Sequence, residues 1–219
     1  MKLVDCVKTD VEEYISGHHN EILFNERDFQ MHLAMYLKCT GHYDDVDLEY
    51  YVPSDQLNGY RDLWNSELRL DILIRKGDEF LPIELKYKTK CIHDILNRFN
   101  ENIPNILVVK NHGAQDLGMY DFWKDVKRVE MVRERFCAVK NGLSVFLTND
   151  ESYTKNPRCN SNNKEFRMIE GYNSPAKHWQ RDTSTTKGRP NFDLSNGYDI
   201  HWKSAIFGGH QFQYCIVEI

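Results

Sequence analysis

Two segments with alternating apolar and polar residues, ELRLDILIRK (67–76) and EFLPIELKYK (79–88), constrain the fold more than any other part of the sequence. They are joined by Gly77-Asp78, and glycine at the first central position is what a two-residue type II′ β-turn requires. We therefore predict an antiparallel hairpin. Because side chains alternate between the two faces of a strand, one face of this hairpin is predicted to be apolar and to cover a core, with these residues: Leu68, Leu70, Ile72, Ile74, Leu81, Ile83, Leu85 and Tyr87.

The opposite face of the hairpin brings charged residues together. If Lys76 pairs with Glu79, the same register places Asp71 directly across from Glu84, with Cβ atoms about 5 Å apart. Lys86 lies on that same face. Two opposed carboxylates repel each other unless a cation offsets them, and oxygen ligands in this arrangement suit Mg²⁺ or Mn²⁺. The alternative is a solvated surface on which Lys86 neutralises both acids.

The rest of the 219-residue chain predicts a single α/β domain over residues 1–219, without internal repeats. Helices are expected at 21–38 and from Ala114 to about Arg135. Residues 91–111 are ambiguous, and we expect a short helix there followed by the apolar run 106–109. Further strands are expected at 45–53, 142–150 and 212–219. Residues 151–197 are rich in Asn, Ser, Thr, Lys and Pro, which predicts a loop-rich insertion.

Composition excludes several classes of protein. No stretch approaches the roughly 18 apolar residues of a membrane helix, and the N-terminus lacks the apolar run of a signal peptide. The six cysteines form no CxxC pair, which favours a cytoplasmic protein without disulfides or membrane association. No Walker, GxGxxG or HExxH motif is present, which argues against nucleotide-driven chemistry and a zinc site.

Charge is distributed unevenly along the chain. The net charge of −5 argues against a protein that coats nucleic acid nonspecifically. Residues 1–60 contain 12 acidic and 4 basic side chains, whereas residues 151–190 contain 8 basic and 4 acidic ones. The later segment would suit a phosphate backbone, or it is a solvated loop. Three aromatic or imidazole side chains in or after this segment have two interpretations, base stacking or burial as anchors of the loop: Trp179, His178 and Trp202.

The pattern Leu-Asp71-(x12)-Glu84-Leu-Lys86, after a helix with an acidic residue, resembles the PD-(D/E)XK nuclease superfamily. This resemblance implies a restriction-endonuclease-like mixed β-sheet flanked by helices. It also implies that Asp71 and Glu84 bind metal and that Lys86 is catalytic. Glu26 corresponds to the helical glutamate that assists metal binding, with Glu21 as the competing position. Leu70 stands where the name of the family has proline.

A branch of that superfamily similar to RecB carries a Gln-x-x-x-Tyr motif on the helix after the hairpin. This chain has Gln115 and Tyr120, one residue further apart, so Gln115 is a weaker candidate for substrate contact. Lys88 and the neighbouring Lys90 are candidates for contact with phosphates, or exposed residues at a strand end. On the helix expected from Ala114, three charged residues share one face, which contacts substrate, a partner or solvent: Asp121, Asp125 and Arg128.

These residues together predict a metal-dependent nuclease that hydrolyses phosphodiester bonds with a water activated on Mg²⁺ or Mn²⁺. DNA is favoured over RNA because the resembled family acts mostly on DNA. Cutting of a duplex would favour a homodimer or a component of a larger DNA-processing system. Two alternatives remain. One is a catalytically inactive nuclease-like fold that binds nucleic acid or a protein, and the other is a purely structural interaction protein.

Overall fold

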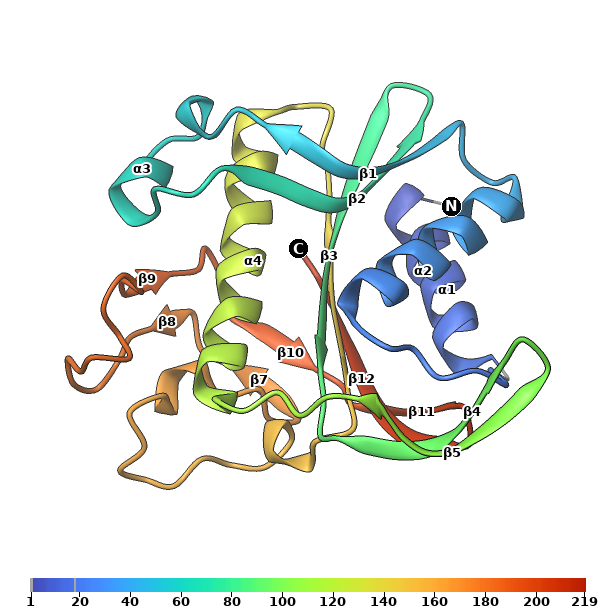
Figure 1. Cartoon of the computed structure of the whole chain (residues 1–219). Coiled ribbons are helices and arrows are strands. Elements are labelled where there is room, and N and C mark those ends of the chain that lie inside the picture. The colour runs from blue at the N-terminus through green and yellow to red at the C-terminus, as the bar shows by residue number, and fades with distance from the viewer. Residues whose placement is uncertain (1, 18) are drawn as a thin grey trace.

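The computed structural model describes residues 2–17 and 19–219. A six-stranded mixed sheet in the order β1-β2-β3-β6-β12-β11 forms its centre, with helices α1 and α2 on one face and α4 on the other (Figure 1). Neighbouring strands are antiparallel except for β3 and β6, which are parallel. The strands are β1 (Asp45–Val52), β2 (Leu68–Lys76), β3 (Glu79–Lys88), β6 (Leu143–Thr148), β11 (Lys203–Phe207) and β12 (His210–Glu218), and the helices are α1 (Leu3–Ser16), α2 (Glu26–Thr40) and α4 (Gln115–Arg135).

The two faces of the sheet cover two separate hydrophobic cores. On the α1 and α2 side, Phe29 and Leu33 of α2 are fully buried against the central strands. On the α4 side, Phe122 and Trp123 are equally buried, and the ring of Phe122 packs edge-on against Phe146 of β6. The domain is therefore a three-layer mixed α/β structure, as the sequence predicts at this coarser level.

The predicted hairpin forms with the predicted register. Lys76 pairs with Glu79, and Gly77 has the positive φ of +58° that the turn needs. The ladder ends at Ile72 and Ile83, so the predicted pair of Asp71 and Glu84 is not part of it. The prediction of one continuous apolar face is wrong. Ile72 and Ile74 join the core beside α1 and α2, whereas two earlier residues of β2 join the core beside α4: Leu68 and Leu70.

The change of face occurs at Asp71, where β1 and β2 bend together. Glu49 of β1 has a positive φ of +52°, a conformation that is uncommon for a residue with a side chain. Gln30 of α2 holds this bend from the side. Its Nε2 atom donates to Glu49 Oε1 at 2.9 Å and to the Asp71 carbonyl oxygen at 2.7 Å. Local alternation predicts the strand but not this bend, because the bend is stabilised by Gln30, which lies 41 positions from Asp71 in the sequence.

Most other predicted elements are present, with corrections at their ends. The first predicted helix begins at Glu26 rather than residue 21, because Asn25 caps it by accepting a hydrogen bond from Asp28 N at 3.0 Å. The helix expected from Ala114 to Arg135 is confirmed as α4. Helix α1 and strand β11 were not predicted.

The short helix expected within residues 91–111 is wrong. This segment forms a hairpin of β4 (Ile92–Arg98) and β5 (Glu101–Val109). Its two-residue turn is Phe99-Asn100, and both residues have positive φ, as in a type I′ turn. Pro104 lacks the amide hydrogen that a helix needs, which is the local signal against a helix. The hairpin lies beyond the end of the central sheet (Figure 1).

Residues 151–202 fold onto α4 and contain short elements. These are η2 (Glu151–Tyr153), η3 (Lys164–Phe166), β7 (Gly171–Asn173), β8 (Ala176–Lys177), β9 (Phe192–Asp193) and β10 (Tyr198–Ile200). Phe166 is fully buried, and its ring centroid lies 4.5 Å from that of Trp179. Trp179 is 8% exposed and stacks on Tyr120 of α4. Trp179 therefore anchors the segment, while Trp202 is partly buried and donates to Met168 O at 2.8 Å.

Two further short helices, η1 (Ser54–Gln56) and α3 (Tyr60–Leu63), connect β1 to β2. Among the helices of the described residues, none is both long enough and apolar enough to span a lipid bilayer.

Replacing Phe166 with alanine tests whether residues 151–202 are an integral part of the core. We expect the free energy of unfolding to fall by about 3–5 kcal/mol, because a fully buried aromatic ring is lost. Urea denaturation followed by circular dichroism measures this change. Phe99→Ala is the matched control, because Phe99 is 97% exposed and its loss should change stability by less than about 0.5 kcal/mol. Equal, small effects would contradict the packing described here.

Candidate active site

The four residues that the sequence predicts as a site lie around the junction of β2, β3 and α2. Asp71 stands at the bend of β2, and Glu84 and Lys86 lie on β3. Glu26 is the first residue of α2, and its Oε2 accepts a hydrogen bond from Tyr87 N at 2.8 Å. The charges of Asp71 and Glu26 both act on the pKa of Lys86. The fold thus places all four side chains in one electrostatic environment.

Asp71 continues the contact between β2 and β3 with its side chain. Where the regular ladder ends, its Oδ2 atom accepts a hydrogen bond from Leu85 N at 2.7 Å. Burial raises the pKa of the Asp71 carboxyl to about 6, against the opposing effects of the Lys86 charge and the Leu85 N–H. The negative charges of Asp125 and Glu26 raise this pKa further. The positive charge near the Asp71 carboxylate is therefore too small to offset its burial and the neighbouring carboxylates.

Glu84 is the most buried of the four residues, with an exposed fraction of 3%. It pairs with Ser144 of β6 in the parallel ladder. Burial raises the pKa of Glu84 well above its ordinary value, and the charges of Asp125 and Asp71 raise it further. Within residues 2–17 and 19–219, Glu84 Oε1 has no hydrogen-bond partner. A buried carboxylate oxygen without a partner is costly, and a cation would satisfy it.

Lys86 forms an ion pair with Asp125 of α4 and donates to the Leu85 carbonyl oxygen at 3.0 Å. Burial lowers the pKa of Lys86, but the negative charges of Asp125, Glu26, Asp71 and Glu84 outweigh this effect and raise it well above its ordinary value. Lys86 is therefore protonated at neutral pH. It can stabilise negative charge or orient a polar group, but it cannot act as a general base.

Asp125 is the ion-pair partner of Lys86, a pairing that was not predicted from the sequence. It is 3% exposed, and Arg128 Nη1 lies 3.3 Å from its Oδ1 atom. Helical spacing correctly places Asp125 and Arg128 on one face of α4, but this face packs against the hairpin. The sequence did contain a signal for this pairing. Side-chain alternation places Lys86 on the face opposite the α1 and α2 core, so a helix on that face had to provide its counter-charge.

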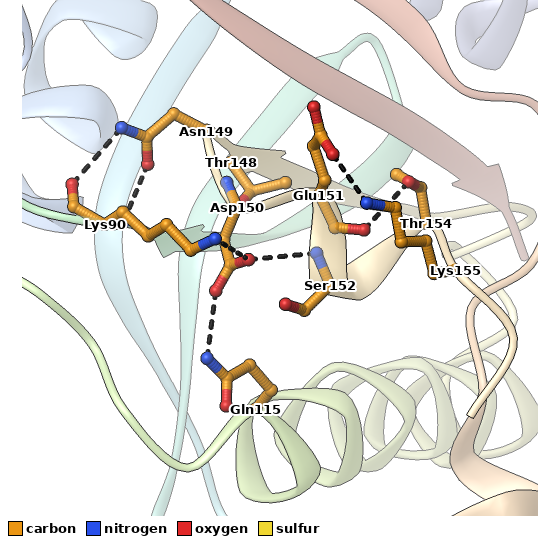
Figure 2. A network of polar contacts seen from close by, with 9 residues as sticks. All are labelled: Lys90, Gln115, Thr148, Asn149, Asp150, Glu151, Ser152, Thr154 and Lys155. Atoms are coloured by element: carbon orange, nitrogen blue, oxygen red, sulfur yellow. Dashed lines mark hydrogen bonds and ion pairs between the residues drawn. The ribbon is translucent and has the colours of Figure 1, made fainter. Parts of the chain in front are cut away.

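Gln115 and Lys90 belong to a different polar network, centred on Asp150 (Figure 2). Gln115 Nε2 donates to Asp150 Oδ2 at 2.9 Å, and Lys90 Nζ lies 3.2 Å from Asp150 Oδ1. Asp150 is 1% exposed. Burial would raise its pKa, but hydrogen bonds from Gln115, Ser152 and Lys90 hold the pKa below its ordinary value. This network joins the start of α4 to the end of β6.

Lys88, the other candidate for substrate contact, is partly buried at the end of β3. Its charge acts on Asp121 of α4 and lowers the pKa of that carboxyl, although burial and the charge of Asp125 raise the pKa overall. Lys88 therefore lies on the side of the sheet that faces the Lys86–Asp125 pair.

The donors fit a cation that is completed by substrate and water. In the described chain, no three or more His, Cys, Asp or Glu side chains are arranged to hold a metal ion by themselves. Mg²⁺ typically uses one or two carboxylates, with water and substrate phosphate as its remaining ligands. Glu84, with its unpartnered oxygen, and Asp71, with its raised pKa, match this requirement.

A scan against protein-family models, a search of curated proteins and a search of solved structures each returned no significant match to this chain.

The raised pKa of Asp71 gives a pH-dependent prediction. Because the pKa rises from 3.8 to about 6 on folding, the native protein binds more protons than the unfolded chain between these values. The stability associated with protonated Asp71 is fully present below about pH 4 and is lost as the pH rises through about 6. Asp71→Asn keeps a neutral acceptor, so its free energy of unfolding relative to wild type should rise by about 2–3 kcal/mol from pH 4 to pH 7.

Urea denaturation in EDTA across this pH range measures the difference. Asp78→Asn, which changes an exposed residue of the same hairpin, is the control and should follow wild type at every pH. A constant difference between Asp71→Asn and wild type would contradict the raised pKa.

Proposed function

We propose that this protein is a metal-dependent nuclease of the PD-(D/E)XK type, which hydrolyses phosphodiester bonds in DNA. The observation that carries the proposal is the unpartnered Glu84 Oε1 atom in the described chain, buried in the same environment as Asp71 and a protonated Lys86. The mixed sheet flanked by helices is consistent with a restriction-endonuclease-like fold.

In this proposal Asp71 and Glu84 hold Mg²⁺ or Mn²⁺, and Glu26 assists from the start of α2. When bound, a divalent cation would lower the pKa of a coordinated water and offset negative charge on phosphoryl oxygens. Lys86 orients the attacking water or stabilises the charge that develops on the phosphate, because its ammonium group is fixed and protonated. Burial of Glu84 excludes bulk water, which strengthens each of these electrostatic interactions.

Asp125 has a positioning role in the same proposal. Its ion pair fixes the ammonium group of Lys86, and Arg128 in turn holds Asp125. A lysine side chain has four rotatable bonds and loses considerable entropy when it is ordered. The ion pair orders the Lys86 side chain before the substrate binds, so this entropy is not lost on binding.

DNA is proposed as the substrate because of the family resemblance. The basic segment 151–190 lies on the α4 side of the sheet and would attract a phosphate backbone. A homodimer or a larger DNA-processing assembly would supply the second site that cutting of a duplex needs. The second candidate function is binding of nucleic acid without cleavage, and the experiment below distinguishes it.

Calorimetric titration of Mn²⁺, combined with a cleavage assay on linear, circular and single-stranded DNA, tests the proposal. Wild type should bind Mn²⁺ and cut at least one of these substrates. Asp71→Asn and Glu84→Gln should lose Mn²⁺ binding, and their cleavage rates should fall at least about 100-fold because charge stabilisation is removed. Glu79→Gln, at the far end of the same hairpin, is the matched control and should behave as wild type.

Each result has a clear meaning. Mn²⁺ binding without cleavage of any substrate by the wild type would favour the binding-only function. Absence of Mn²⁺ binding by the wild type would refute the metal site, and the carboxylates would then be a structural charge cluster.

Asp125→Asn tests the positioning role of Asp125. Without its partner, the ammonium group of Lys86 becomes mobile, so kcat should fall at least about tenfold while KM changes less than about twofold. Steady-state cleavage kinetics measure both constants. Asp125→Glu keeps the charge and should recover part of kcat. If both variants lose activity only in proportion to their unfolded fraction, Asp125 has a purely structural role.

A further inference from the structure

A cavity of about 530 Å³ lies beside the candidate active site. Its walls come from the connection between α3 and β2 (63–66), from Lys124 of α4 and from residues 179–191. This volume falls within the roughly 300–1,000 Å³ of typical small-molecule sites. The cavity is thus large enough for one nucleotide and much too small for a duplex.

One wall of the cavity is apolar. Trp64 and Trp179 contribute to it, together with Pro190. The N–H groups of both indole rings are engaged within the protein, since Trp64 Nε1 donates to Tyr120 Oη at 3.1 Å and Trp179 Nε1 donates to the Arg189 carbonyl oxygen at 3.0 Å. The two tryptophans are only 4% and 8% exposed, so they present apolar ring edges, and no hydrogen-bond donors, to the cavity.

Two cationic side chains, Lys124 and Arg189, also line the cavity. Lys124 is partly buried, and its Nζ atom lies 5.5 Å from the centre of the Trp64 ring. Arg189 donates to the Thr185 carbonyl oxygen at 3.0 Å. Neither Lys124 nor Arg189 forms a salt bridge with a carboxylate of the described residues, although Asp182 also lines the cavity. Partly buried cations without a counter-ion favour an anionic ligand.

A chain of contacts joins the cavity to the candidate active site. Ser66, in the cavity wall, accepts a hydrogen bond from Arg128 Nη2 at 2.9 Å. Arg128 contacts Asp125, and Asp125 pairs with Lys86. Lys124 is the residue before Asp125 on α4, and the charge of Lys86 acts on it. The cavity wall is therefore linked to Lys86 through Arg128 and Asp125, although Lys86 itself does not line the cavity.

We propose that this cavity is a subsite for one nucleotide of a DNA strand, adjacent to the phosphate that is cleaved. The base lies against the wall formed by Trp64 and Trp179, and its phosphate contacts Lys124 and Arg189. This inference rests on the proposed function, because the neighbouring phosphate is the one held at Lys86. It also assigns a function to Arg189, the basic residue of the segment 151–190 that lines the cavity.

Fluorescence anisotropy with a short labelled single-stranded oligodeoxynucleotide, in EDTA to prevent cleavage, tests the subsite. Lys124→Gln and Arg189→Gln should each weaken binding about tenfold, since a phosphate contact is lost. Lys187→Gln is the matched control, because Lys187 is exposed in the same loop but does not line the cavity. It should weaken binding less than about twofold. Thermal melting checks that each variant is folded.

Oligonucleotides in which single positions are abasic distinguish a base subsite from simple attraction to phosphate. An abasic nucleotide at the occupied position should weaken binding to wild type roughly tenfold, and it should have little effect on Arg189→Gln, in which the subsite is already impaired. Equal binding of every abasic oligonucleotide and the intact one would overturn the proposal. An equal loss in Lys187→Gln and Arg189→Gln would also overturn it, because general charge would then explain the binding.

The cleavage assay separates failure of this inference from failure of the proposed function. If wild type cuts DNA but Lys124→Gln and Arg189→Gln bind and cut normally, the subsite is wrong and the nuclease function stands. If these variants lose binding while wild type shows no cleavage with Mn²⁺, the subsite stands and the nuclease function fails.

Discussion

The ion pair between Lys86 and Asp125 joins β3 to α4 across one face of the sheet, and the rest of the site depends on it. Lys86 is surrounded by carboxylates from α2, β2, β3 and α4. Removing either partner of a buried pair leaves an uncompensated charge, which is strongly unfavourable. The position of α4 over β3 is therefore fixed by electrostatics as well as by its apolar residues. The same charge balance leaves Glu84 and Asp71 with raised pKa values, a state that a cation would relieve.

A second constraint is the bend at Asp71. It carries β1 and β2 from one hydrophobic core to the other, so that a single strand contributes to both faces of the sheet. Gln30 stabilises the bend through its contacts with Glu49 and with the Asp71 carbonyl oxygen. The bend frees the Asp71 carboxylate from a regular ladder position and lets it accept from Leu85 N. The geometry of the candidate site thus arises where regular strand pairing ends.

The segment 151–202 completes the α4 side of the domain. Its buried aromatic residues pack on Tyr120 and Trp123, and the indole of Trp123 donates to the Phe166 carbonyl oxygen at 3.0 Å. This packing covers a helix face that would otherwise be exposed. It also brings Arg189 of the segment to the cavity that Lys124 lines. The composition of the segment indicates loops, and the structure adds that these loops share the core.

The sequence by itself determined the elements whose signals are local. Turn chemistry at Gly77 and the alternation of side chains predicted the register of β2 and β3, and helical periodicity predicted α4. These same signals selected Asp71, Glu84 and Lys86, and the family resemblance added Glu26. Only the tertiary structure decided the bend at Asp71, the packing of residues 151–202 and the pairing of Lys86 with Asp125. The physical reason is that each of these depends on contacts between residues far apart in the chain, which local periodicity does not encode.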